Sequence, residues 1–134
     1  MATRRNPGTT AVRAAPASAD DELDRVFAVV ARYFGLLSEP TRLRILHTIC
    51  LDERSVSAIV AATGATQTNV SRHLALMHRA GVVSRRREGS TVYYRVADPE
   101  FIEICRSVCV RIASRIDEWQ PLRQGLLHFA AQHY

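Results

Sequence analysis

One stretch, residues 66–83, constrains the fold most, because it contains a helix, both of its ends and a change of period. Thr66 is a typical N-cap residue, and Gly81 suits the position just past a helix C-terminus. Between them, apolar residues recur at helical spacing and form one face: Val70, Leu74 and Met77. After Gly81 the period falls from 3.6 to 2. The stretch therefore predicts an amphipathic helix followed directly by a β-strand.

The opposite face of this helix carries short hydrogen-bonding side chains and guanidinium groups. Such groups read base edges and bind phosphates in a DNA major groove. A plain solvated face is the alternative for this helix taken alone. Arg79 extends the face, and His73 either approaches a phosphate or packs within the motif. The candidate DNA contacts on the helix are Gln67, Thr68, Asn69, Ser71, Arg72 and His73.

Three further helices are predicted before this one. Apolar residues at helical spacing predict a first helix over residues 20–37, and Ser38 and Pro40 suit the start of a second helix that ends near Cys50. A short polar break, 51–54, follows. Ser55 or Ser57 caps a third helix that ends at Gly64, two residues before the helix described above. Two helices joined by so short a turn, the second polar and basic on its outer face, form a helix-turn-helix.

The residues after Gly81 predict a β-hairpin. Val82 and Val83 begin one strand, residues 91–96 alternate as a second, and Glu88-Gly89-Ser90 forms the turn. A hairpin beside a helix-turn-helix is a wing, so the predicted fold class is mainly α with a small β-hairpin wing. Arginines at its tip favour contacts with the DNA backbone or minor groove over a merely solvated run. The candidate contacts on the wing are Arg85, Arg86, Arg87 and Tyr93.

Asp98 and Pro99 begin a last long helix as N-cap and first residue. Its apolar stripe is wider than a small core needs, and the first helix has a similar surplus. The stripe contains Phe101, Cys105, Val108, Ile112 and Trp119. Both surpluses favour a homodimer through the first and last helices. Pro121 breaks the helix, and a short terminal helix is expected to fold back on the dimer.

The 134 residues suffice for one domain. We expect a disordered basic arm over residues 1–19, a winged-helix domain over 20–119 and a short helix over 120–134 that completes the dimer. Residues 55–97 hold six arginines against one acidic residue, Glu88, which favours a polyanion such as double-stranded DNA as partner. The sequence lacks a membrane-length apolar run, a secretory signal and a catalytic constellation. We therefore expect a cytoplasmic protein that is not an enzyme and has no membrane partner.

Three motifs in this order resemble the ArsR/SmtB family of bacterial repressors. They are L-S-E-P-T-R-L-R-I-L at 37–46, N-V-S-R-H-L-A-L-M-H-R-A-G-V-V at 69–83 and R-R-R-E-G-S-T-V-Y-Y-R-V-A-D-P at 85–99. The resemblance covers roughly residues 20–119. It implies a homodimer that binds an operator palindrome and leaves it when an inducer binds.

The family's known sensing sites do not carry over intact. Where the family has a C-V-C arsenic site, this chain has Ser55-Val56-Ser57, which supplies no thiolate. Of the family's zinc site on the last helix, only Asp98 is retained, since the histidine positions fall at about Glu100 and Arg111. These two sensing sites are therefore expected to be absent.

The remaining candidate sensor is formed by Cys50, Cys105 and Cys109. Cys105 and Cys109 lie one helical turn apart, so both could bind one soft ion, with Cys50 as a third sulfur ligand. We expect no obligatory cofactor, but a thiophilic metalloid or metal such as arsenite as inducer. A Cys50–Cys109 redox or persulfide switch is the close alternative. A third possibility is that all three cysteines are small apolar residues of the core or of an interface.

Two other kinds of protein would fit the same sequence. One is a protein-interaction module with an incidental basic face, and the other is an architectural DNA-binding protein without an inducer. A mobility shift with the DNA upstream of the gene separates the repressor from the interaction module.

Overall fold

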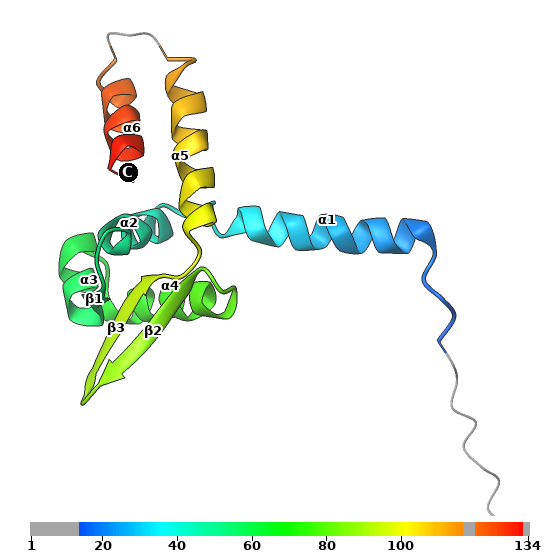
Figure 1. Ribbon diagram of the computed structural model, residues 1–134, viewed down its shortest axis with the longest axis horizontal. Helices are drawn as coiled ribbons and strands as arrows, with labels where there is room; N and C mark the ends of the chain where they lie inside the picture. Colours follow the sequence, from blue (N-terminus) through cyan, green and yellow to red (C-terminus); the bar gives the residue numbers. More distant parts are fainter. Residues whose placement is uncertain (1–13, 117–119, 133–134) are drawn as a thin grey trace, which may run out of the picture.

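The computed structural model describes residues 14–116 and 120–132 and forms a small head with two projecting parts (Figure 1). The head contains α2 (Pro40–Ile49), α3 (Val56–Thr63), α4 (Gln67–Arg79) and a sheet. Helix α1 (Ala19–Gly35) extends away from the head on one side. Helices α5 (Pro99–Ala113) and α6 (Pro121–Ala131) form an antiparallel pair above it. No helix in the described ranges is long and apolar enough to cross a membrane.

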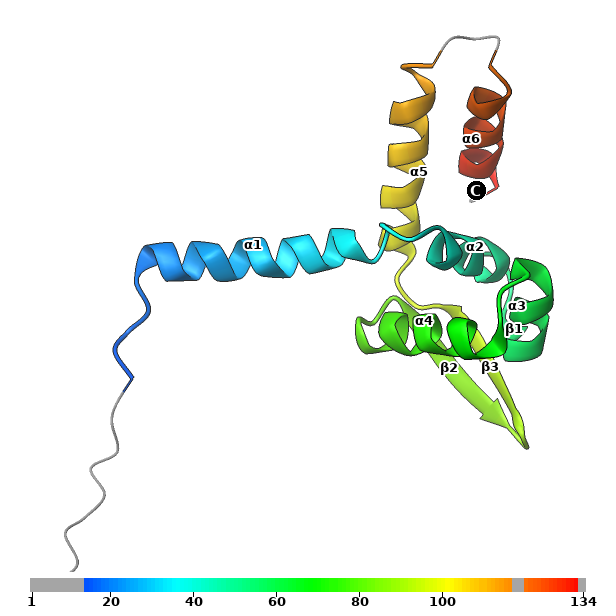
Figure 2. The same cartoon turned by 180° about the vertical axis from the view of Figure 1, so that it is seen from behind.

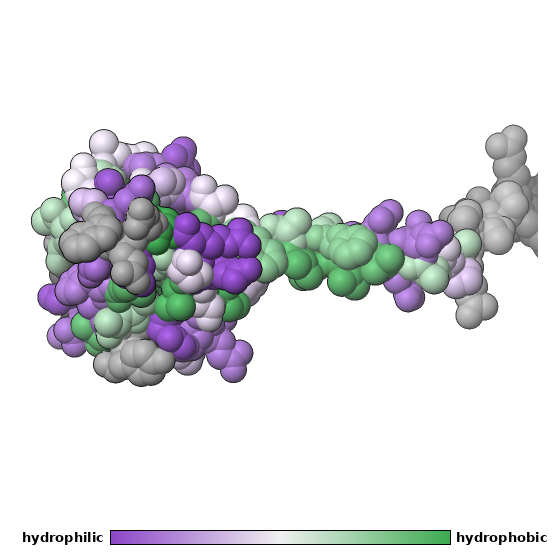
Figure 3. Space-filling view, turned by 90° about the horizontal axis from the view of Figure 1, so that it is seen from above, coloured by the Kyte–Doolittle hydropathy of each residue, from purple (hydrophilic) through white to green (hydrophobic). Residues whose placement is uncertain are grey.

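Helix α1 begins with a capping box, in which Ser18 and Asp21 each accept a hydrogen bond from the other's backbone N–H. The predicted start of a helix at residue 20 is thus correct to within one residue. None of the residues of α1 is buried, although it carries several large apolar side chains. Figure 3 shows this apolar surface along the projecting helix, with more hydrophilic residues towards its N-terminal end.

The core of the head forms between the predicted apolar faces. Val70, Leu74 and Met77 of α4 are fully buried and pack with Ile45 of α2 and Ile59 of α3 in one cluster. The helix-turn-helix turn follows the predicted chemistry. Thr66 caps α4 by accepting the amide of Asn69, and Gly64 ends α3 with a φ of 69°, a left-handed conformation that suits glycine.

The cap of α2 differs from the prediction. Glu39, rather than Ser38, occupies the N-cap position and accepts the backbone N–H of Arg42. The hydroxyl of Ser38 instead donates to the carbonyl of Gly35 at the end of α1. Of the two serines proposed to cap α3, Ser55 does so. The longer side chain of Glu39 reaches the first turn of α2, so the hydroxyl of Ser38 can bond to the end of α1 instead.

The wing is a three-stranded antiparallel sheet in the order β1-β3-β2. The predicted hairpin is present as β2 (Val83–Glu88) and β3 (Thr91–Val96), with Arg86 opposite Tyr93. The alternation in β3 is also as predicted, since Tyr94 is buried while Arg95 is exposed. A two-residue strand, β1 (Arg54–Ser55), adds to β3 from what the sequence indicated was a polar break.

Helix α5 begins as predicted, with Asp98 as N-cap and Pro99 in its first turn. Helix α6 packs along α5 of the same chain (Figure 2). The ring centroid of Phe129 of α6 lies 5.1 Å from that of His47 of α2. Phe101 and Cys105 of the predicted stripe are buried in the core cluster of the head, whereas Val108 and Ile112 stay 44% exposed. The predicted stripe is therefore divided into a part that packs in the core and a part that is exposed to solvent. Trp119 and most of the predicted arm, residues 1–13, lie outside the described residues.

Candidate nucleic-acid interface

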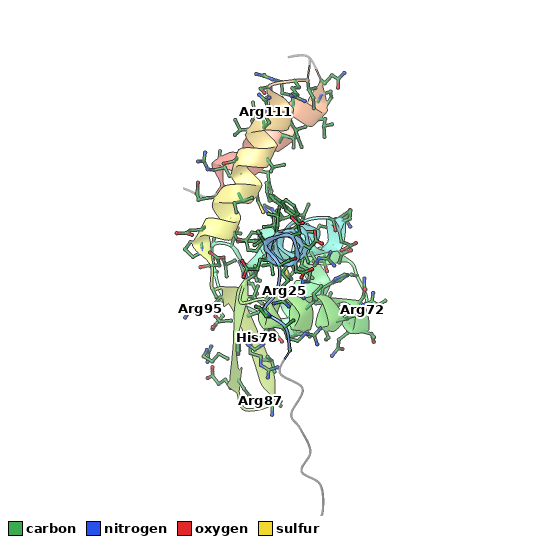
Figure 4. All side chains as sticks on the ribbon, turned by 90° about the vertical axis from the view of Figure 1, so that its right-hand side faces the viewer. Arg25, Arg72, His78, Arg87, Arg95 and Arg111 are labelled. Atoms are coloured by element: carbon green, nitrogen blue, oxygen red, sulfur yellow. The ribbon has the colours of Figure 1, made fainter. Side chains whose placement is uncertain are left out.

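The outer face of α4 is open to solvent. Its exposed residues stand opposite the buried face of the helix, so they are available to a groove of DNA: Gln67, Thr68, Ser71 and Arg72. The helix is held from behind by its apolar residues, which gives these side chains a rigid base. In Figure 4, Arg72 lies at the edge of the head, far from Arg111 of α5.

Arg72 is oriented by a neighbour on its own helix. Its Nη2 donates to Oδ1 of Asn69 at 2.7 Å, one turn earlier. No carboxylate in the described part of the chain forms an ion pair with Arg72. An arginine fixed on one side and unpaired on the other keeps its remaining donors for an external acceptor such as a base edge or a phosphate. Asn69, half-buried, thereby supports a contact rather than offering one of its own.

His73 lies away from this face. It is 7% exposed, its Nδ1 lies 3.2 Å from Nη1 of Arg42, and its Nε2 lies 3.5 Å from Oε2 of Glu39. Including His73 among the DNA contacts was therefore wrong, and packing within the motif, the other option, is correct. The reason is geometric, since His73 neighbours the buried Leu74 on the helix and turns with it towards α2.

The three arginines of the wing divide between its two faces. In a strand, alternate residues point to opposite faces, so Arg85 and Arg87 share one face and Arg86 takes the other. Arg85 and Arg87 are exposed and, with Val92, line a hollow of about 220 Å³. Within the described ranges neither forms an ion pair. Both guanidinium groups are therefore free to bind phosphate, and Figure 4 shows Arg87 near the outer end of the wing.

Arg86 already has partners inside the protein. Its Nε donates to Glu53 at 3.2 Å, its Nη1 donates to Glu88 at 2.7 Å, and its guanidinium stacks 4.6 Å from the ring centroid of Tyr93. The hydrogen bonds to these carboxylates raise the pKa of Arg86 and lower the pKa of Glu53. Arg86 and Tyr93, both predicted to contact DNA, are thus engaged in holding the wing to the chain before β1.

Glu53 is the functional residue that sequence reasoning missed. It lies in the short break after α2, 33 positions from Arg86. Only the addition of β1 to the sheet brings the two together, and no local pattern encodes that pairing.

The three cysteines do not assemble into the predicted site within this chain. All three are free thiols, and no group of three His, Cys, Asp or Glu side chains in the described ranges could hold a metal ion. Cys50, at the C-terminal end of α2, donates its Sγ–H to the carbonyl of His47 and faces the first turn of α5. Cys105 and Cys109 lie further along α5, so the three-sulfur arrangement is not formed.

The thiols are also in surroundings that keep them protonated. Burial raises the pKa of Cys50 and Cys109 above the ordinary thiol value. Burial, with the nearby Cys109, raises the pKa of Cys105 to about 11. A thiolate is the form that binds soft metals and attacks electrophiles, so these thiols are poor nucleophiles at neutral pH in the folded chain.

Comparison with known proteins places this site in a family. The sequence profile described as bacterial regulatory protein, arsR family, matches residues 39–85. The regulator Rv0081 of Mycobacterium tuberculosis is 33% identical over 109 residues, covering 78% of this chain and 96% of the relative. A probable mercury resistance operon repressor of Streptomyces lividans is 36% identical over 90 residues, covering 65% of this chain and 72% of the relative.

Solved structures agree in fold. The crystal structure of Rv0081 has a TM-score of 0.61 and covers 67% of this chain and 94% of that chain. The solution structure of Mb0332 from Mycobacterium bovis, a homodimeric winged helix-turn-helix domain, is 32% identical, with a TM-score of 0.59 and coverage of 75% and 91%. These relatives are transcriptional regulators, which confirms the prediction that the chain is not an enzyme. The chain belongs to the ArsR family of winged helix-turn-helix transcriptional regulators.

Proposed function

We propose that this chain is a homodimeric repressor that reads a palindromic operator with α4 and binds the neighbouring backbone with Arg85 and Arg87. The observation that carries the proposal is the exposed polar face of α4 beside a wing with two unpaired arginines. Side chains on α4 supply sequence readout in a major groove, while wing contacts supply affinity without sequence preference.

The dimer is supported by the exposed apolar residues outside the head. Phe27, Val30 and Phe34 of α1 are 45–59% exposed, and Val108 and Ile112 of α5 are 44% exposed. An isolated helix of this length is marginal in water, so α1 needs a partner surface to be stable. The homodimeric state named for Mb0332 makes a second copy of this chain the natural partner.

A mobility shift with the DNA upstream of the chain's own gene tests the proposal. The expected result is a shifted complex containing two chains, weakened by added salt and by Arg72→Ala. An interaction module with an incidental basic face would bind this DNA no better than a shuffled duplex of the same length. That result would contradict the proposal.

Release by a thiol-directed inducer is the finer part of the proposal. The Streptomyces lividans relative is a probable mercury resistance operon repressor, and soft sulfur ligands select soft metals. Because no group of three ligands forms in the described residues, the pair Cys105 and Cys109 on α5 is the better candidate to bind a mercury-type or arsenite-type inducer. Because Cys105 is buried, binding would require the packing around it to open.

Serine replacements test this part. The parent complex should release DNA on addition of mercuric ion or arsenite, and Cys105→Ser combined with Cys109→Ser should abolish release. Loss of release in Cys50→Ser and Cys109→Ser under an oxidant or persulfide, with Cys105→Ser still responsive, would favour the redox alternative. Unchanged release in the triple mutant would show that the cysteines are structural.

A further inference from the structure

A single side chain, Arg42 in the first turn of α2, contacts both the end of α1 and the middle of α4. Its Nε donates to the carbonyl of Leu36 at 2.9 Å and its Nη2 donates to the carbonyl of Gly35 at 2.8 Å. Its Nη1 lies 3.2 Å from Nδ1 of His73. The last carbonyls of a helix lack partners within that helix. Arg42 satisfies the carbonyl of Leu36 and adds a bond to the carbonyl of Gly35, which also accepts from Ser38.

The chemistry of arginine fixes the proton on His73. Arginine only donates, so Nδ1 of His73 must be the acceptor and the proton must be on Nε2. Nε2 faces Oε2 of Glu39 at 3.5 Å, which agrees with this assignment. The charged groups that act on the imidazole are Glu39 and Arg42 from α2 and Arg72 from α4 itself. The contact with Arg42 is thus formed by a neutral histidine.

Elsewhere α1 and α4 are separated. An open groove of about 750 Å³ lies between them, with Val29 and Tyr33 of α1 on one side and Leu76 and Arg79 of α4 on the other. In Figures 1 and 2, α1 joins the head at its C-terminal end and projects away from it. The direction of α1 relative to α4 therefore depends on three things: the turn at residues 35–39, the contacts of Tyr33 with Asp98 and Phe101, and the side chain that ties the turn to His73.

We propose that Arg42 is a positioning residue for DNA reading, and that with His73 it forms the joint that sets the angle between α1 and α4. This inference rests on the proposed function, because the angle matters only if α1 pairs two heads across an operator. In such a dimer the angle at each joint determines the spacing and tilt of the two α4 helices. Two heads at the wrong spacing bind as two weak sites instead of one strong site.

The joint also has a defined response to pH. Protonation of His73 would place a proton on Nδ1, directly facing the guanidinium of Arg42, and would replace a hydrogen bond by repulsion. Burial, with the charges of Arg42 and Arg72, lowers the pKa of His73 below its ordinary value, while Glu39 opposes the shift. The contact between Arg42 and His73 is therefore fully formed above the ordinary histidine pKa of 6.5. It is lost as the pH falls through the lowered pKa of His73.

The test uses the full chain and an operator selected from random DNA by the parent protein. Arg42→Lys keeps the charge but loses the planar fork that reaches three acceptors. His73→Asn keeps an acceptor near the position of Nδ1 without titrating. Arg44→Lys, an exposed arginine on the same helix, is the matched control. Operator and shuffled DNA are titrated by fluorescence anisotropy across pH, with mass by light scattering and folding by thermal melting.

We expect Arg42→Lys to weaken operator binding by about tenfold while dimer mass and binding to shuffled DNA stay as in the parent. The parent should lose operator affinity as the pH falls below about 6.5, and His73→Asn should bind normally at neutral pH with a flat profile. The matched control should behave as the parent in both respects.

Two results would overturn the joint while leaving the proposed function intact. One is operator affinity in Arg42→Lys within twofold of that in Arg44→Lys. The other is an acid loss of affinity in His73→Asn equal to that of the parent, a comparison that stands even if Arg42→Lys proves unstable. A parent chain that is monomeric or selects no DNA would instead contradict the proposed function, and the joint with it.

Discussion

The head and the projecting helix α1 differ in how their apolar side chains are covered. In the head, Ile45, Ile59 and Leu74 are completely buried, and helix caps satisfy the turn between α3 and α4. In α1, no residue is buried and Phe27 remains 59% exposed. The head is complete as one chain, whereas α1 is a surface without a partner. The residues of the recognition helix are thus held by packing within the chain, whereas the apolar side chains of α1 stay exposed.

The largest expected effect comes from charging the unpartnered surface. Phe27→Asp places a carboxylate on the apolar side of α1, where pairing with a second copy would bury it without a partner. We expect loss of the dimer and a fall in operator affinity of about 100-fold or more, because the two heads no longer bind as a linked pair. Light scattering and anisotropy measure the two quantities.

Arg25→Asp is the matched control for that change. It adds the same carboxylate to the same exposed helix, but on its polar side. Its dimer should persist. If both variants stayed dimeric with unchanged operator affinity, α1 would not be the assembly surface and the contrast with the head would be lost.

A smaller effect is expected at the head. Arg72→Ala removes the donors that Asn69 orients and should cost about 1–3 kcal/mol of operator binding if the arginine is bidentate to a base. Discrimination at that base pair should relax as well. The dimer should be untouched, because Arg72 lies on α4 and not on α1 or α5. Equal affinity of parent and variant for the operator would exclude Arg72 as a reading residue.

The wing offers a sharper comparison between neighbouring arginines. Arg87→Ala should weaken binding to operator and unrelated DNA alike and reduce the slope of log affinity against log salt by about 1. Arg86→Ala should leave that slope unchanged and lower the melting temperature instead, because Arg86 is held by Glu53 and Glu88. A larger change of slope for Arg86→Ala than for Arg87→Ala would reverse the assignment of the two faces.

The smallest effect on DNA binding is expected at the thiols in the absence of an inducer. Cys105→Ser should leave operator affinity within about twofold of the parent, because the side chain is buried and offers DNA no contact. Its raised pKa of about 11 predicts slow alkylation at neutral pH that accelerates as the pH rises. Mass spectrometry after timed alkylation checks this, and a neutral-pH rate equal to that of the unfolded chain would contradict it.

Local signals predicted most of the head. Thr66, Gly64 and Asp98 are cap residues whose chemistry acts within one helical turn, and the hairpin follows from alternation around Gly89. The buried face of α4 followed from spacing alone. Each of these features depends on residues close in sequence, which explains why one sequence sufficed.

The features that the sequence did not predict depend on contacts between residues far apart in the chain. The burial of His73 against Glu39 and Arg42, and the pairing of Arg86 with Glu53, each join segments more than 30 residues apart. The burial of Cys105 in the same cluster as Leu74 of α4 likewise joins distant segments. Period and spacing identify an apolar face, but they do not say which surface will cover it.

The most direct test of the account varies the distance between two operator half-sites. Binding of the full chain is measured on duplexes in which the half-site centres are moved apart by a few base pairs at a time. If two heads are held by paired α1 helices, affinity should be highest near one helical turn, about 10–10.5 base pairs, and should collapse when the spacing changes by half a turn. Equal affinity at every spacing would show two independent heads and would contradict the account.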